Sequence, residues 1–191
     1  DGEPSFMPAL LRLSRIFNLS SFEVDLLLLC AGMELDSEFP GLCGEVHGNS
    51  NMNYPTFQLA LHLLHSPHWS TLSSGSAIRY WQLLEIGGGP ELTRCPLRLD
   101  EKILHYMLGI NHIDQRLLPY MEPLITVDEL APSQEEVAVE IASAWNTIDS
   151  PVPPVFFLWG NQVEAKRAAA VKAARMLGRE IRIMAGHLLP T

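Results

Sequence analysis

The sequence LLEIGGGPELTRCPLRLD, residues 83–100, decides the fold of the first part of the chain. Leu83–Ile86 is a short apolar run, Gly87–Pro90 is typical of a turn, and Leu92–Leu99 returns as an extended run that ends in alternating apolar and polar residues. This pattern predicts a β-hairpin. Pro96 cannot donate a ladder hydrogen bond, so we expect it at an edge or a bulge.

Apolar residues recur at helical spacing on both sides of this hairpin. The pattern predicts an N-terminal helix, three further helices before the hairpin and one after it, over residues 7–17, 22–35, 55–65, 77–83 and 101–108. Ser20 and Glu23 have the spacing of a capping box at the start of the second helix. Residues 36–54 are rich in Gly, Asn, Ser and Pro without periodicity, so we expect a long loop there.

Helix, helix, helix, hairpin, helix is the order of a winged-helix domain, which we predict over residues 1–125 together with the N-terminal helix. The third helix and the hairpin of this fold usually face a partner, often DNA. They place Arg79, Trp81 and Arg98 on the expected interaction surface. Residues 1–125 carry 7 basic and 14 acidic side chains, a net charge of −7, which argues against duplex DNA. We therefore expect protein contact or a scaffold role, with a winged-helix DNA-binding protein as the alternative.

A second informative stretch is VFFLWGNQVEAKRAAAVKAA, residues 155–174, which predicts a strand, a turn and a helix. This is the setting of a phosphate-binding loop, and Gly160 and Lys166 match the first glycine and the lysine of that motif. Ala165 replaces the second glycine, and Arg167 replaces the hydroxyl that would bind magnesium. Gly160 and Lys166 are thus candidate cofactor-binding residues of a degenerate loop; the other interpretation is an ordinary strand-to-helix turn.

The surrounding residues predict an incomplete α/β segment. Residues 126–153 read as a connecting helix and a proline-rich linker, and residues 154–191 as strand, helix and a second strand at 180–184. A βαβ order implies a parallel sheet, but two strands do not make a stable one. The fold class expected for the whole chain is mainly α with a small β-hairpin, followed by a truncated P-loop-like α/β segment.

Composition limits the classes of partner. The chain has 191 residues, 47% of them hydrophobic, and a formal charge of −9 without a cluster of Lys and Arg. Nucleic acid and anionic membrane surfaces are therefore poor partners by default. The sequence contains no apolar run long enough to span a bilayer. Three cysteines, far apart and without a CxxC pair, are typical of a reduced cytoplasmic protein.

Other polar clusters predict neither catalytic nor metal-binding residues. His62, His65 and His68 are spaced by three, and such a pair on one helix can bind zinc. However, Pro67 breaks the helix before the third histidine and no acidic residue lies in this stretch, so polar-face or partly buried histidines are the preferred interpretation. The spacing of the remaining residues indicates no Ser/His/Asp or Cys/His arrangement.

The chain resembles the N-terminal part of bacterial AAA-family ATPases that carry a winged-helix domain ahead of their ATPase modules, some of which are associated with phage-tail-like contractile injection systems. The resemblance rests on LSSFE and LLLLCA at 19–31, on PTF and LAL at 55–61, and on LRLDEKILHY before Leu108-Gly109 at 97–109.

This resemblance implies that residues 150–191 open a first, often degenerate ATPase-like module of a longer chain. The 191 residues would then be a non-catalytic N-terminal regulatory or protein-interaction region, while ATP and magnesium serve the parent family. The implied partners are proteins, or other copies or modules of the ATPase, with no membrane contact. A weak ATP-binding module that uses the degenerate loop is a further alternative. In an AAA sheet the first two strands are not neighbours, so the resemblance implies that this segment is an incomplete subdomain, which is either mobile or pairs its strand edges with another copy.

Overall fold

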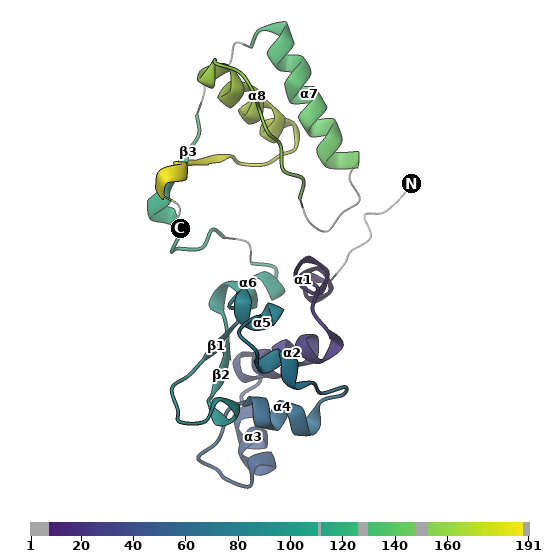
Figure 1. Cartoon of the computed structure of the whole chain (residues 1–191), viewed down its shortest axis with the longest axis vertical. Coiled ribbons are helices and arrows are strands. Elements are labelled where there is room, and N and C mark those ends of the chain that lie inside the picture. Colours follow the sequence, from purple (N-terminus) through teal and green to yellow (C-terminus); the bar gives the residue numbers. More distant parts are fainter. Residues whose placement is uncertain (1–7, 111, 126–129, 148–152, 189–191) are drawn as a thin grey trace. The chain divides into compact units, whose positions relative to one another are not determined.

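The structure, a computed structural model, describes residues 8–110, 112–125, 130–147 and 153–188 (Figure 1). The chain forms two compact units, Asp1–Asn111 and His112–Thr191. In the first unit helices surround a β-hairpin, and in the second a pair of helices accompanies a two-stranded sheet. None of the helices among the described residues is long and apolar enough to cross a membrane.

Side-chain caps stabilise the starts of three of the helices of the first unit. Its helices are α1 (Ala9–Phe17), α2 (Ser21–Leu35), α3 (Phe39–His47), α4 (Phe57–Leu63), α5 (Ala77–Tyr80) and α6 (Glu101–Met107). The predicted capping box is confirmed, because Ser20 Oγ accepts the Glu23 amide at 3.2 Å while the Glu23 carboxylate accepts the Ser20 amide at 3.0 Å. Asp100 caps α6 by accepting the Lys102 amide at 2.9 Å.

Helix α3 lies inside residues 36–54, so the expected long loop was wrong. Packing on α2 explains the helix, since the ring of Phe39 covers Gly32 so closely that a Cβ atom there would lie 2.7 Å from Phe39 Cζ. Cys43 is buried one turn later, and Gly48 ends the helix in the left-handed conformation at φ 64°. This helix contains a proline and two glycines, which have low helix propensity, so the sequence does not predict it. Its tertiary contacts stabilise it.

The predicted hairpin is confirmed. Strands β1 (Leu84–Ile86) and β2 (Leu97–Leu99) pair antiparallel, with Leu84 opposite Leu99 and Ile86 opposite Leu97. The connection is longer than expected, because Leu92–Arg94 forms a 3-10 turn in place of strand. Leu97 also donates its amide to the Pro55 carbonyl at 2.9 Å, which ties the hairpin to the start of α4.

The core of the first unit joins α2, α4, α5 and the hairpin. Its largest fully buried side chains include Phe22, Leu26, Leu27, Phe57, Ile78 and Leu97. At about 1.5–3 kcal/mol for each large apolar side chain removed from water, burial of this set is the main stabilising contribution to the unit.

The second unit differs from the expected α/β segment. Helices α7 (Pro132–Thr147) and α8 (Val163–Met176) pack together, and the predicted helix up to Gly178 is confirmed. The expected strand at the start of residues 155–174 has no ladder partner among the described residues. The predicted parallel pairing was also wrong: β4 (Arg182–Met184) pairs antiparallel with β3 (Met121–Pro123), a segment that contains proline and has too few residues for a strand pattern.

We expect Phe57→Ala to lower the free energy of unfolding of the first unit by about 3–5 kcal/mol, because it removes a fully buried ring and leaves a cavity. Denaturant titration followed by circular dichroism measures this change. Leu63→Ala is the matched control, since Leu63 belongs to the same helix but is exposed; its cost should stay below about 1 kcal/mol. Equal losses in the two variants would contradict this description of the core.

Candidate functional site

Three aromatic side chains, Phe17, Tyr80 and Trp81, form a cluster that we name the aromatic patch. Trp81 lies 5.7 Å from Phe17 and 5.0 Å from Tyr80 between ring centroids, the second pair being edge-on. Tyr80 is 67% exposed and Trp81 is 56% exposed. Large exposed aromatic rings are enriched in protein–protein contact surfaces, because they bury much apolar area on binding and lose little conformational entropy.

Helix α5 places this patch on the surface of the first unit. It has only four residues, and its second, Ile78, is fully buried in the core, so Tyr80 and Trp81 at its end turn away from the core. Gln82 then adopts a left-handed conformation with φ 50°, and Leu83 donates its amide to the Ile78 carbonyl at 2.9 Å. The chain thereby turns directly from α5 into β1, and the aromatic rings are left at the turn.

Of the two arginines of the expected interaction surface, Arg79 has a hydrogen-bond partner within the fold, and Arg98 faces an acidic residue across the hairpin. The guanidinium of Arg79 donates to the Leu72 carbonyl, so this half-buried side chain braces the loop before α5. Arg98 is exposed on β2 directly opposite Glu85 on β1. Among the described residues, no hydrogen bond, ion pair or ring contact joins Arg98 to Arg79 or Trp81. The three residues therefore do not form one cationic site.

The candidate nucleotide loop has an internal hydrogen bond. Lys166 Nζ donates to the Gly160 carbonyl at 2.8 Å, which brings the two candidate residues together. Gly160 has φ 133°, a conformation that favours glycine. Helix α8 begins at Val163, so Asn161 and Gln162 are the only residues between Gly160 and the helix. The motif's four free positions are thus partly helical, and the lysine ammonium binds a backbone oxygen of the same loop.

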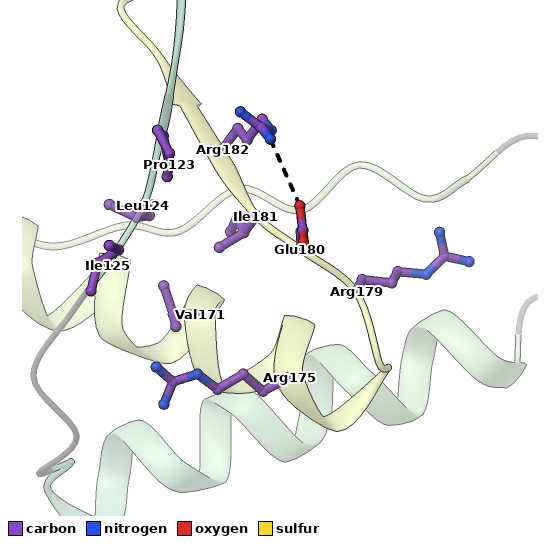
Figure 2. A pocket seen from close by; sticks show the side chains of 9 residues that line it. All are labelled: Pro123, Leu124, Ile125, Val171, Arg175, Arg179, Glu180, Ile181 and Arg182. Carbon is purple, nitrogen blue, oxygen red and sulfur yellow. Dashed lines mark ion pairs between the residues drawn. The ribbon is translucent and has the colours of Figure 1, made fainter. Parts of the chain in front are cut away.

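A cavity of about 420 Å³ in the second unit is lined by three arginines that sequence analysis did not single out (Figure 2). Arg182 approaches Glu180 at 3.7 Å, and Arg179 lies over the ring of Trp145 at 4.9 Å from its centroid. Figure 2 shows Arg175, Arg179 and Arg182 pointing in different directions. Because they do not converge, they do not form a binding site for one anion.

A hydrogen-bonded histidine links α2 to the loop after α4. Ser20 Oγ lies 2.8 Å from His68 Nε2, and His68 Nδ1 lies 2.8 Å from Ser70 Oγ and 3.1 Å from Thr71 Oγ1. The pair resembles a nucleophile and its base, but Ser20 Oγ is also the cap of α2 and hydroxyl groups, not a carboxylate, orient the imidazole. We interpret this network as a structural clamp. No group of residues in the described ranges has the composition of a metal site.

The three cysteines of the chain lie inside the fold. Cys30, Cys43 and Cys95 are free and buried. Burial raises the pKa of the Cys30 thiol well above its usual range, with a smaller contribution from the nearby Cys43, and burial also raises the pKa of Cys43. Since the thiolate is the reactive form, neither group is a nucleophile at neutral pH.

Comparison with known proteins identifies the first part of the chain. A family model described as a winged helix domain, variant, matches residues 2–121. Searches of curated proteins and of solved structures gave no match. The predicted winged-helix fold is confirmed, while the ATPase-like module and the association with contractile injection systems stay predictions. Because the match covers more than half of the sequence, the chain belongs to the family of variant winged helix domains.

Proposed function

We propose that the winged-helix domain binds a protein partner, and that the chain is a non-catalytic regulatory or adaptor region of an AAA-family ATPase. The observation that carries the first part is the aromatic patch. It lies at the end of α5, next to the hairpin, where winged-helix domains usually meet their partners.

The charges of the same region support a protein partner over DNA. A protein that binds duplex DNA neutralises several phosphates with free cations. Here Arg79 is held by a carbonyl, Arg94 lies 3.6 Å from Glu91, and Arg98 stands opposite Glu85. The net charge of −7 over residues 1–125 adds long-range repulsion of phosphates.

The ATPase parentage rests on the resemblance of the blocks at 19–31, 55–61 and 97–109. On this proposal the second unit contains the start of a degenerate module in which Gly160 and Lys166 are remnants of a nucleotide loop. The bond between Lys166 and the Gly160 carbonyl gives the lysine a role that needs no nucleotide. ATP binding through this loop is the second candidate function, because the two matching residues do lie together.

We expect duplex DNA to bind no more tightly than about 100 µM at physiological salt, the weak end of non-specific binding, because residues 1–125 carry a net charge of −7 and Arg79 is held by the Leu72 carbonyl. Fluorescence anisotropy with a labelled duplex measures this. Micromolar binding that weakens with salt and is lost in Arg79→Ala with Arg98→Ala, but is kept in the exposed control Arg15→Ala, would favour the DNA-binding alternative.

We expect a photoreactive phenylalanine analogue in place of Trp81 to cross-link the chain covalently to its protein partner, which gives a product of one defined mass. The reason is that Trp81 lies in the proposed contact surface. Mass spectrometry of the purified adducts identifies them. The same analogue at position 69 is the control, since Trp69 is an exposed tryptophan outside the aromatic patch. Nucleic-acid adducts at position 81, or equal protein adducts at both positions, would contradict the proposal.

We expect no micromolar ATP binding by the 191-residue chain in isothermal titration with magnesium present, because Arg167 replaces the magnesium-binding hydroxyl and Lys166 is bonded to Gly160. If ATP does bind, comparing its affinity for Lys166→Ala and for Lys172→Ala shows whether it binds at the loop. Lys172 belongs to the same helix but lies outside the loop. Loss of binding in Lys166→Ala alone would establish the second candidate function and overturn the first for this unit.

A further inference from the structure

The first unit exposes a second group of large apolar side chains, separate from the aromatic patch, on helices α2 and α3. We name this group the α2–α3 patch. Its members are Leu28 and Leu35 of α2 and Leu42 and Val46 of α3, which are 47%, 59%, 51% and 49% exposed.

The leucines of the α2–α3 patch lie beside the contact between the two helices. At this contact the ring of Phe39 packs on Gly32. Leu28 and Leu35 are neighbours of Gly32 on the surface of α2, four residues before it and three residues after it. In the same way Leu42 is the i+3 neighbour of Phe39 on α3. The exposed leucines thus border one interhelical contact, and a continuous apolar surface of this kind marks an interaction site.

Helix α3 is held by a different side from the one that carries the patch. The Sγ atom of Cys43 lies 4.0 Å from the Sδ atom of Met33 on α2. One turn later, His47 Nε2 lies 3.2 Å from a backbone carbonyl of the loop that follows the helix. Cys43 and His47 therefore anchor α3, while Leu42 and Val46 lie outside these contacts and face the solvent.

The charged residues of this part of the chain have one sign. Between Arg15 and Arg79 the sequence contains no lysine or arginine. Four exposed carboxylates belong to the stretch that carries the patch, namely Glu34, Asp36, Glu38 and Glu45. Glu38 and Glu45 are helical neighbours of Leu42. None of the four carboxylates takes part in an ion pair between described residues, so the patch has an acidic border.

We propose that the α2–α3 patch binds a basic amphipathic helix of a protein partner. Such a helix lays its apolar stripe on the exposed leucines, and its lysines and arginines pair with the carboxylates at the border. Leu28 and Leu35 are two turns apart, about 10 Å along α2, which matches the i and i+7 spacing of such a stripe.

The charge of the border selects this partner over others. Carboxylates repel the phosphates of nucleic acids and of anionic membranes. A two-fold pairing of the patch with the same patch of a second copy would bring like charges together. A basic helix is the occupant that complements both the apolar and the acidic parts of the surface.

The segments that lead into and out of the first unit lie away from the patch. Its first and last helices, α1 and α6, contact each other. Figure 1 shows both at the opposite end of this unit from α3. The aromatic patch is also a different surface, so the proposal is independent of the function proposed above.

A synthetic peptide of about 18 residues supplies the probe, with leucines at i, i+3, i+4 and i+7 positions and lysines elsewhere. We expect the 191-residue chain to bind the fluorescently labelled peptide with a Kd of about 10 µM or lower at physiological salt, as measured by anisotropy. A peptide of the same composition without a helical apolar face should bind at least tenfold more weakly. A Kd above about 100 µM, or equal binding of the two peptides, overturns the proposal.

Substitutions locate the bound peptide. Leu42→Ser with Val46→Ser should weaken binding at least tenfold. Glu38→Gln with Glu45→Gln should weaken it and reduce its dependence on salt. These side chains are exposed, so the substitutions leave the fold intact. Leu63→Ser is the matched control, because Leu63 is 47% exposed but lies on α4, and its affinity should equal that of the native chain. An equal loss in the control, or no loss in the patch variants, contradicts the proposal.

Thiol labelling tests whether this chain itself covers the patch. The three native cysteines are buried, so Leu42→Cys adds one accessible thiol. We expect a maleimide to label it as fast as it labels Leu63→Cys on α4. Labelling of Leu42→Cys at least tenfold slower shows that the patch is covered, and overturns the proposal. So does a dimer in sedimentation velocity that Leu42→Ser dissociates, because the occupant is then a second copy.

Discussion

Burial of α2 is the constraint on which the first unit depends. This helix is apolar around most of its circumference, so a single neighbouring helix cannot cover it. Phe22, Leu26, Leu27 and Cys30 are all buried, and α4, α5 and the hairpin provide the cover. The helix α3 follows from the same constraint, because it packs against the C-terminal half of α2 through Phe39. The elements that follow α2 in the winged-helix order are thus the elements that cover α2.

The aromatic patch is a consequence of how small a part of this cover α5 provides. Four residues make one turn of helix, and one fully buried side chain, Ile78, anchors it. The next residues reach the surface, and they are aromatic where a DNA-binding protein needs cations. The one arginine in α5 is used to hold the preceding loop. The exposed surface at this position is therefore aromatic and weakly charged.

The sequence predicted the features that local rules determine. Turn chemistry located the hairpin, the Ser20 and Glu23 pair located the start of α2, and Gly178 located the end of α8. The missed elements depend on contacts between distant residues. Helix α3 is stabilised by the packing of Phe39 on Gly32, and β3 is stabilised by pairing with β4 about 60 residues later. No local sequence pattern predicts either contact. The segment at 155–159 has strand propensity, but propensity cannot supply a neighbour to pair with.

The same distinction explains why Gly160 and Lys166 could be found while their roles could not. A motif records residue types and spacing, and at these two positions both match. What Lys166 binds depends on where α8 begins. With the helix starting at Val163, the lysine reaches back to the Gly160 carbonyl and closes the turn that follows Trp159. The lysine thus ties the end of the segment at residues 155–159 to the first turns of α8.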